Sequence, residues 1–293
     1  MNEIPSRAHA GSQVPRWHFR MMRDSVRNAA IEAAIASCNL RGKTVVEIGT
    51  GAGLPAMLFA KYGARKVFTC EMDKRIAGAA QEIIRKNDLH DRIVVIAKSS
   101  RQAIVDGDLP SAPDIIFTET LDAGVVGEGY EPIAEDIRQI ASPTTVVMPD
   151  RIQQFGFLCA DVQAFESNSV FNQCGFDLSG FNLFAERSYF SVIQMLHDPV
   201  CLSPTVLFRS YDYLNPSALD PVEHQVIVHS SGLCHGMTSY FHANFGKFLV
   251  SSREQKSHWR TAFHPLRVPM PVESGRRYYL RGDKSGSIDL VST

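Results

Sequence analysis

Hydrophobic and polar positions in the first half of the chain follow two different periods. Short apolar runs rich in β-branched residues, which are typical of buried strands, lie at 44–48, 66–71, 93–97, 114–118 and 144–148. Segments with helical spacing or helix-forming composition lie between or before them, at 17–38, 54–62, 77–86 and 132–140. Strands that alternate with helices predict an α/β fold with a parallel, doubly wound, Rossmann-like sheet.

The pattern changes after residue 150. Short strands separated by turn residues are predicted at 152–160, 206–212, 225–230 and 237–244, with only a short helical piece near 182–188. This half is expected to be antiparallel, as a β-barrel or a sandwich. The predicted organisation is a flexible lead at 1–16, a Rossmann-like domain at 17–150 and a β-barrel substrate domain at 151–293.

Composition limits the classes of protein that remain. The chain has 293 residues, 44% of them hydrophobic, and 30 basic against 31 acidic residues. Such a chain buries a large core, and its neutral charge gives no electrostatic reason to expect nucleic acid or a membrane as partner. Its six cysteines include no CxxC pair, and no apolar run is long enough to span a bilayer. We expect a soluble, cytoplasmic protein with reduced, mostly buried thiols.

A glycine-rich turn follows the first predicted strand. Gly49, Gly51 and Gly53 stand between that strand and a helix, where glycine permits a tight turn and close approach of a ligand. Glu71, about twenty residues later, is placed to accept the ribose hydroxyls of a nucleoside. The acidic Glu47 would repel a pyrophosphate but suits the cationic methionine end of S-adenosylmethionine. The segment resembles the first motif of class I methyltransferases; a nucleotide enzyme is the alternative.

A second glycine-rich segment carries two carboxylates. Glu119 ends a predicted strand, and Glu128 follows nine residues later across a loop with three glycines. The carboxyl ends of parallel strands are where open α/β sheets bind ligands, so both side chains can face one cavity. The alternative interpretation is two solvated loop acids.

Three segments together resemble the protein arginine methyltransferase family. TETLDAGVVGEG resembles its double-E loop, in the form of the monomethylating type III branch, while Met21–Asn28 and Ser257–Arg260 resemble its pre-motif helix and its THW loop. The resemblance spans about residues 17–265 and implies S-adenosylmethionine-dependent methylation of a guanidino nitrogen of arginine, with monomethylation favoured. A guanidinium is planar, stays protonated and pairs bidentately with carboxylates, so Glu119 and Glu128 would orient it toward the sulfonium methyl.

The same resemblance implies roles for further residues. Arg27 would pair with the methionine carboxylate of the cofactor, and Asp24 and His258 would form a hydrogen-bonded pair that takes up the proton lost after transfer. Trp259 would line the substrate slot. Asp122 would narrow the pocket or contact the guanidinium, unless it only stabilises its turn. The other expected contacts are Met22 at the substrate, and Ser99 and Glu119 at the cofactor.

Some features depart from the family pattern or stay open. The aromatic element that covers the cofactor in the family is not recognisable around residues 17–19. Residues 179–194 are the candidate dimerisation arm of a possible homodimer, because their aromatics could form an exposed patch. These aromatics are Phe181, Phe184, Tyr189 and Phe190. No metal site is expected, because Cys234, His235 and His242 have no evident fourth partner.

The acceptor is not decided by these motifs. It could be free L-arginine or an arginine in a peptide or protein, and the neutral charge slightly favours free arginine over basic protein tails. A methyltransferase acting on another amine, or a non-catalytic S-adenosylmethionine-binding regulator, remain as alternatives.

Overall fold

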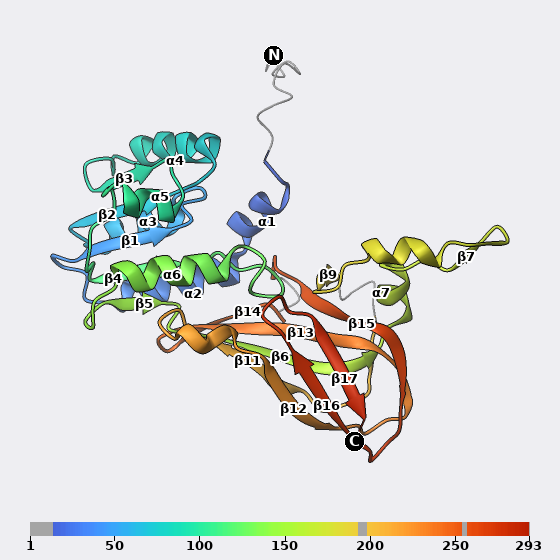
Figure 1. Cartoon of the computed structure of the whole chain (residues 1–293). Coiled ribbons are helices and arrows are strands. Elements are labelled where there is room, and N and C mark those ends of the chain that lie inside the picture. Colours follow the sequence, from blue (N-terminus) through green and yellow to red (C-terminus); the bar gives the residue numbers. More distant parts are fainter. Residues whose placement is uncertain (1–13, 193–197, 254–256, 293) are drawn as a thin grey trace.

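The computed structural model describes residues 14–192, 198–253 and 257–292. Its first half contains a five-stranded sheet in the order β3-β2-β1-β4-β5, with all neighbouring strands parallel (Figure 1). The predicted parallel α/β sheet is therefore confirmed. Its strands are β1 (Thr44–Ile48), β2 (Lys66–Cys70), β3 (Ile93–Ile96), β4 (Ile115–Thr118) and β5 (Val146–Met148).

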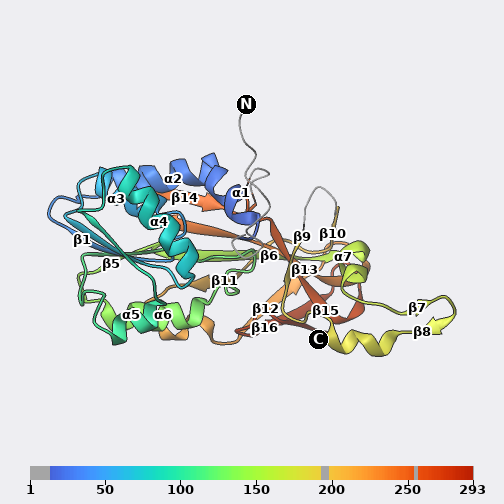
Figure 2. The same cartoon turned by 90° about the horizontal axis from the view of Figure 1, so that it is seen from above.

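Helices cover both faces of this sheet. Figure 2 shows α2, α3 and α4 on one face and α5 and α6 on the other. The helix predicted within 17–38 is two helices, because the backbone leaves the helical region at Asp24, whose side chain accepts a hydrogen bond from the Arg27 backbone N–H and caps the second helix. The helices are α1 (Trp17–Arg23), α2 (Ser25–Ala36), α3 (Leu54–Lys61), α4 (Lys74–Lys86), α5 (Ser100–Val105) and α6 (Tyr130–Ile140).

The second half contains antiparallel sheets, as expected for the β-barrel. A seven-stranded sheet is built around β6 (Arg151–Ala160), β13 (Gly232–Phe245) and β15 (Thr261–Val272), and a three-stranded sheet has the order β12-β16-β17. Buried side chains of both sheets, such as Leu158 and Leu280, share one apolar cluster. The remaining strands are β9 (Phe190–Val192), β10 (Val200–Cys201), β11 (Val206–Tyr211), β12 (Val222–Ile227), β14 (Phe248–Ser251), β16 (Arg277–Gly282) and β17 (Ile288–Ser292).

The two halves share apolar packing. Helix α2 packs on β14, and the ring of Phe117 in β4 stacks on that of Phe245 in β13, with centroids 5.9 Å apart. Buried residues of both halves belong to one core cluster, which therefore crosses from the parallel sheet into the barrel. The expected domain boundary at residue 150 falls in the connection between β5 and β6 and stays a prediction.

A segment between β6 and β9 projects from the barrel (Figures 1 and 2). It contains α7 (Val162–Ser167), the short hairpin of β7 (Asn172–Gln173) and β8 (Phe176–Asp177), and the 3-10 helix η1 (Ser179–Phe184). The exposed patch predicted there is only partly present. Phe181 and Phe184 are 67% and 72% exposed, whereas Phe190 packs on Phe263 of β15 and Tyr189 packs against the loop after β4.

The terminal lead, the cysteines and the helix lengths bear on three expectations about the whole chain. Residues 1–13 of the predicted flexible lead and residues 193–194 of the predicted arm lie outside the described residues. All six cysteines are free, but only Cys70, Cys159 and Cys234 are buried. Across 14–192, 198–253 and 257–292, the helices are too short or too polar to cross a membrane.

Candidate active site

The turn after β1 depends on glycine. Gly49, Gly51 and Gly53 have φ angles of +90°, +51° and +81°, which side chains with a Cβ rarely adopt. A Cβ on Gly49 would also lie only 2.8 Å from Cγ2 of Thr120, so this glycine permits the close approach of the loop after β4. Gly53 then precedes α3 directly. The turn thus leaves backbone exposed at the carboxyl edge of the sheet, where a ligand can reach it.

Two further predicted cofactor residues lie at this edge. Glu71 follows β2, and its carboxylate accepts hydrogen bonds from the backbone N–H of Gly51 at 3.1 Å and of Asp73 at 3.0 Å. Each oxygen retains a further lone pair for a ligand hydroxyl. Ser99 follows β3 and caps α5 by accepting from the Gln102 N–H at 3.3 Å. Both remain candidate cofactor contacts.

Glu47 lies beneath the glycine turn and is fully buried. Oε2 accepts a hydrogen bond from the Thr69 hydroxyl at 2.6 Å, whereas Oε1 has no hydrogen-bond partner among the described residues. Burial raises the pKa of Glu47 to about 8. An unpartnered buried carboxyl oxygen below a glycine cradle fits a ligand with a cationic or N–H-bearing end, as S-adenosylmethionine has.

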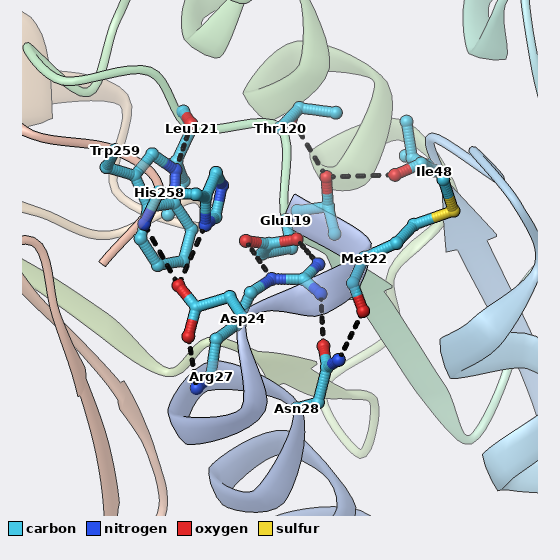
Figure 3. A network of polar contacts seen from close by, with 11 residues as sticks. Met22, Asp24, Arg27, Asn28, Ile48, Glu119, Thr120, Leu121, His258 and Trp259 are labelled. Atoms are coloured by element: carbon cyan, nitrogen blue, oxygen red, sulfur yellow. Dashed lines mark hydrogen bonds and ion pairs between the residues drawn. The ribbon is translucent and has the colours of Figure 1, made fainter. Parts of the chain in front are cut away.

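Arg27 and Glu119 form a buried, bidentate pair between α2 and the end of β4 (Figure 3). Nε of Arg27 donates to Oε1 of Glu119 at 2.9 Å, Nη2 donates to Oε2, and the two side chains are 5% and 6% exposed. The remaining terminal nitrogen, Nη1, donates to Oδ1 of Asn28 at 2.8 Å. The sequence predicted a cofactor carboxylate, not Glu119, as the partner of Arg27. Glu119 therefore already holds a guanidinium in the forked geometry that was expected for the substrate.

Asp24 and His258 meet across the two halves of the molecule, although they are 234 residues apart (Figure 3). Oδ2 of Asp24 accepts from Nδ1 and from the backbone N–H of His258, both at 3.0 Å. Burial alone would raise the pKa of Asp24, but these bonds and the one from the Arg27 backbone outweigh it and lower the pKa. The hydrogen bond implied by the family resemblance is present; a role in proton transfer remains a proposal.

Trp259 connects the loop around His258 to the loop after β4. Its indole N–H donates to the backbone carbonyl of Leu121 at 2.5 Å, and its ring packs edge-on against Phe241 with centroids 5.2 Å apart. The ring is buried and lies directly beside His258. By contrast, Met22 lies at the surface, with its backbone carbonyl bound to the side chain of Asn28. Trp259 and Met22 remain candidate substrate contacts.

Glu128 is the solvent-exposed member of the predicted pair. Partial burial, followed by the charges of Asp122, Glu119 and Glu71, raises its pKa to about 7. The negative charge of Glu119 is one of the causes that raise the pKa of Glu128, so the two carboxylates influence each other. A cationic ligand would relieve the repulsion among these acids.

Asp122 stabilises the loop after β4. Its Oδ1 accepts from the backbone N–H groups of Gly124 and Gly127 at 3.2 and 3.1 Å, and the Tyr189 hydroxyl donates to Oδ2 at 2.9 Å. These contacts are those of the turn-stabilising alternative; the roles that the resemblance implied for Asp122, narrowing the pocket or contacting the guanidinium, stay predictions. Tyr189 is a missed contributor to the site, because no local motif connects a residue of the projecting segment with a loop 67 positions earlier.

Comparisons with known proteins match a methyltransferase family model and several arginine methyltransferases. Residues 30–143 match the family model described as ribosomal protein L11 methyltransferase (PrmA). The arginine N(omega)-methyltransferase of Streptomyces achromogenes subsp. streptozoticus is 33% identical over 278 residues, which cover 93% of this chain and 77% of that protein. Protein arginine N-methyltransferase 9 of Xenopus laevis is 38% identical over 117 residues, or 40% of this chain and 14% of that protein. Protein arginine N-methyltransferase 7 of Bos taurus is 33% identical over 160 residues, or 52% and 23%.

Two solved structures share the fold along most of the chain. The PRMT1 enzyme-prozyme heterotetrameric complex of Trypanosoma brucei with AdoHcy matches with a TM-score of 0.75 and 21% identity, covering 91% of this chain and 86% of that chain. Protein arginine methyltransferase 10 of Arabidopsis thaliana, in an open conformation, matches with a TM-score of 0.70 and 18% identity, covering 94% and 95%.

Proposed function

Because the chain belongs to the arginine N-methyltransferase family, whose methyl donor is S-adenosylmethionine, we propose that it transfers one methyl group to a guanidino nitrogen of free L-arginine. The geometry of Glu119 carries the proposal: it already binds the guanidinium of Arg27 in a forked contact, and each of its oxygens keeps a further lone pair for the acceptor guanidinium. The relative that is named for arginine aligns with 93% of the chain. Those named for protein arginine align with 40% and 52%.

The proposed mechanism is mainly one of positioning. When bound, S-adenosylmethionine supplies an electrophilic methyl group on a sulfonium. Glu119 and Glu128 hold the acceptor guanidinium between them and draw its positive charge toward the nitrogens that they contact. The free nitrogen then regains lone-pair character and faces the methyl group. Orientation of this kind can supply about 7–11 kcal/mol of the barrier.

A proton must leave the nitrogen that gains the methyl group. His258 is proposed to accept it at Nε2, because Nδ1 is held by Asp24 at 3.0 Å. Asp24, through its bonds to His258 and to the Arg27 backbone, keeps the imidazole in one orientation. This assigns the N-terminal helices a direct part in the site.

Monomethylation is proposed from the loop itself. TETLDAGVVGEG, with Asp122 at its turn, resembles the monomethylating branch of the family. The alternative acceptor, arginine in a peptide or protein, uses the same carboxylates and differs in what surrounds the main chain of the arginine.

One experiment tests acceptor and product together. The protein is incubated with methyl-labelled S-adenosylmethionine and, separately, with free L-arginine, arginine peptides and lysine peptides, and products are identified by mass spectrometry. We expect monomethyl-L-arginine from free arginine. A dimethylated product would overturn monomethylation, and transfer to peptides alone would overturn the free acceptor. Transfer only to lysine would favour a methyltransferase that acts on another amine. Cofactor binding without any transfer would favour a non-catalytic regulator.

A homodimer is also proposed. Phe181, Leu183 and Phe184, which lie on η1 of the projecting segment, are 67%, 70% and 72% exposed, and an apolar cluster of this kind marks an interaction surface.

A further inference from the structure

Asn28 lies in the first turn of α2, directly after Arg27, and has no part in the mechanism above (Figure 3). Its own backbone N–H donates to the carbonyl of Asp24 at 2.9 Å, which fixes its place in the helix. Both ends of its side-chain amide are used. Oδ1 accepts from Nη1 of Arg27 at 2.8 Å, and Nδ2 donates to the backbone carbonyl of Met22 at 2.9 Å. Asn28 therefore joins the guanidinium on α2 to the last turn of α1.

The two contacts fix the orientation of this amide. The two ends of an asparagine amide have nearly the same shape, so the hydrogen-bond partners decide which end points where. If the amide of Asn28 were turned about, its NH2 group would face a donor of Arg27 and its oxygen would face the carbonyl oxygen of Met22. Both bonds would then be lost. The contact with Arg27 and the contact with Met22 therefore support each other.

The contact with Asn28 determines which N–H groups of Arg27 remain for a ligand. A guanidinium has five N–H donors. Nε and Nη2 donate to Glu119, and Nη1 donates to Asn28, so within the described part of the chain each terminal nitrogen keeps one further N–H. The guanidinium is held from two directions, and its plane is thereby fixed. A carboxylate is bound best by N–H groups whose plane is already set, and Arg27 is the residue expected to bind the methionine carboxylate of the cofactor.

The contact with Met22 holds α1, which has few other anchors. None of the residues of α1 is buried. The carbonyl of Met22 belongs to the last turn of this helix, where carbonyl groups have no partner within the helix. The neighbouring side chain, that of Met21, lies opposite the glycine turn, because a Cβ on Gly51 would be 3.9 Å from its Cε. The bond from Asn28 therefore keeps α1 beside the predicted cofactor site.

We propose that Asn28 is a positioning residue, which holds Arg27 in the plane that the methionine carboxylate needs and, through Met22, keeps α1 beside the glycine turn. Because one amide makes both contacts, cofactor binding at Arg27 and the placement of α1 are coupled. The inference rests on the methyl donor of the proposed function and on the proposed role of Arg27. It does not depend on which acceptor is methylated.

The first test is calorimetric titration with S-adenosylhomocysteine, which has the same methionine carboxylate and no methyl group to transfer. Asn28→Ala is expected to raise its Kd about tenfold, because Arg27 loses a charged hydrogen bond that orients it. The KM for S-adenosylmethionine should rise with the Kd, whereas kcat should fall less, since Glu119 keeps both bonds from Arg27. The matched control is Asn87→Ala, which removes the same kind of bond, from Nδ2 to the carbonyl of Ile83 at 2.8 Å, at the end of α4.

Two further measurements separate the contacts of Asn28. In an Arg27→Lys background, Asn28→Ala should weaken S-adenosylhomocysteine binding no further, because the guanidinium that Asn28 holds is gone; this is a double-mutant cycle. Hydrogen exchange measured by mass spectrometry reports the contact with Met22. In Asn28→Ala, α1 should exchange faster than in the unmodified protein, and S-adenosylhomocysteine should slow that exchange less. If Arg27→Lys does not fold, the affinity and the exchange of Asn28→Ala decide alone.

Three results would overturn the inference and leave the proposed function intact. They are equal affinity of Asn28→Ala and Asn87→Ala for S-adenosylhomocysteine, an undiminished loss in the Arg27→Lys background, and unchanged exchange of α1. An unmodified protein that does not bind S-adenosylhomocysteine would remove both the inference and the proposed function. A protein that shows the expected dependence on Asn28 but leaves L-arginine unmethylated would contradict the proposed function alone.

Discussion

Glu119 and Glu128 lie in one loop but in different surroundings. Glu119 is buried and bound by two nitrogens of Arg27, whereas Glu128 is exposed to solvent and surrounded by other acids. A substitution at Glu119 therefore leaves the buried charge of Arg27 without its partner. One at Glu128 removes a carboxylate that no described residue of the chain pairs with an opposite charge.

The two substitutions should therefore separate activity from stability. Glu128→Gln is expected to lower kcat at least about 100-fold, because the charged contact to the acceptor is lost where charge is redistributed in the transition state. Cofactor affinity and melting temperature should change little. Glu119→Gln should lower kcat similarly and also destabilise the fold by about 3 kcal/mol, since it breaks a buried ion pair. Kinetics, calorimetric binding and thermal unfolding check this; Glu135→Gln, at an exposed ion pair of α6, is the control.

Glu128 should also make the rate of the reaction fall at acidic pH. Its pKa is raised to about 7, so below that pH the carboxyl is protonated and neutral and the contact to the guanidinium weakens. We expect kcat/KM for the acceptor to fall as the pH drops through about 7, since this parameter reports groups of the free enzyme. Asp122→Asn removes a charge that raises this pKa, so the limb should move to lower pH. A kcat/KM that stays constant across about pH 6–8 would contradict the assignment.

At the scale of elements, Tyr189 of the projecting segment packs against the loop after β4 and binds Asp122 in it. The ring fits only because Gly124 and Gly286 have no Cβ, which would lie 2.1 and 2.6 Å from ring carbons, and the hydroxyl reaches Asp122. Tyr189→Phe is expected to lower kcat about tenfold with unchanged cofactor affinity, because the loop loses a partly buried hydrogen bond and its carboxylates lose their position. Tyr62→Phe, which removes a surface bond to Glu32 of 2.8 Å, is the control. Equal kinetics of the two variants would exclude the positioning role.

The projecting segment makes a separate prediction about assembly. Replacing Phe181, Leu183 and Phe184 together by serine removes the exposed apolar side chains without touching the barrel core. We expect the protein to change from dimer to monomer in analytical ultracentrifugation, with an unchanged circular dichroism spectrum. A monomeric unmodified protein, or a variant that still dimerises, would show that this segment is not the interface.

How far the sequence predicts this molecule depends on the element. The strand predicted at 44–48 has those bounds in the structure, because four of its five residues are β-branched and a glycine turn follows it directly. β15 escaped prediction because it contains three prolines, and its pairing with β13 is irregular between Cys234 and Gly236. Helices α5 and α7 have six residues each, too few for a periodic signal.

The candidate site likewise contains some features that the sequence predicts and others that it does not. Arg27, Glu119 and His258 lie within motifs that the sequence shows, whereas the contacts that hold them come from elsewhere in the fold. The hydroxyl of Tyr189 on Asp122 and the orphaned oxygen of Glu47 depend on packing between distant segments, and no spacing along the chain encodes them. The contact of Arg27 with Glu119 has the same origin, because the two residues are 92 positions apart along the chain.

At the scale of the whole molecule, the site joins the two halves. The contact of Asp24 with His258 and that of Trp259 with Leu121 each connect the methyltransferase half with the barrel, and the apolar core is continuous between them. Unfolding of one half should therefore expose the core of the other. We infer that the chain unfolds in one cooperative transition, which a bound cofactor shifts as a whole.

Thermal unfolding with and without S-adenosylmethionine tests this coupling. A ligand at 100 times its Kd stabilises the folded state by about 2.7 kcal/mol, which for a chain of this size corresponds to a rise of roughly 5 °C in Tm. Glu71→Ala should abolish most of that rise, because it removes the carboxylate beside the glycine turn, while the exposed Glu82→Ala in α4 should keep it. If two transitions appear and the cofactor shifts only the first, the barrel unfolds independently, and the connections through His258 and Trp259 do not couple the halves.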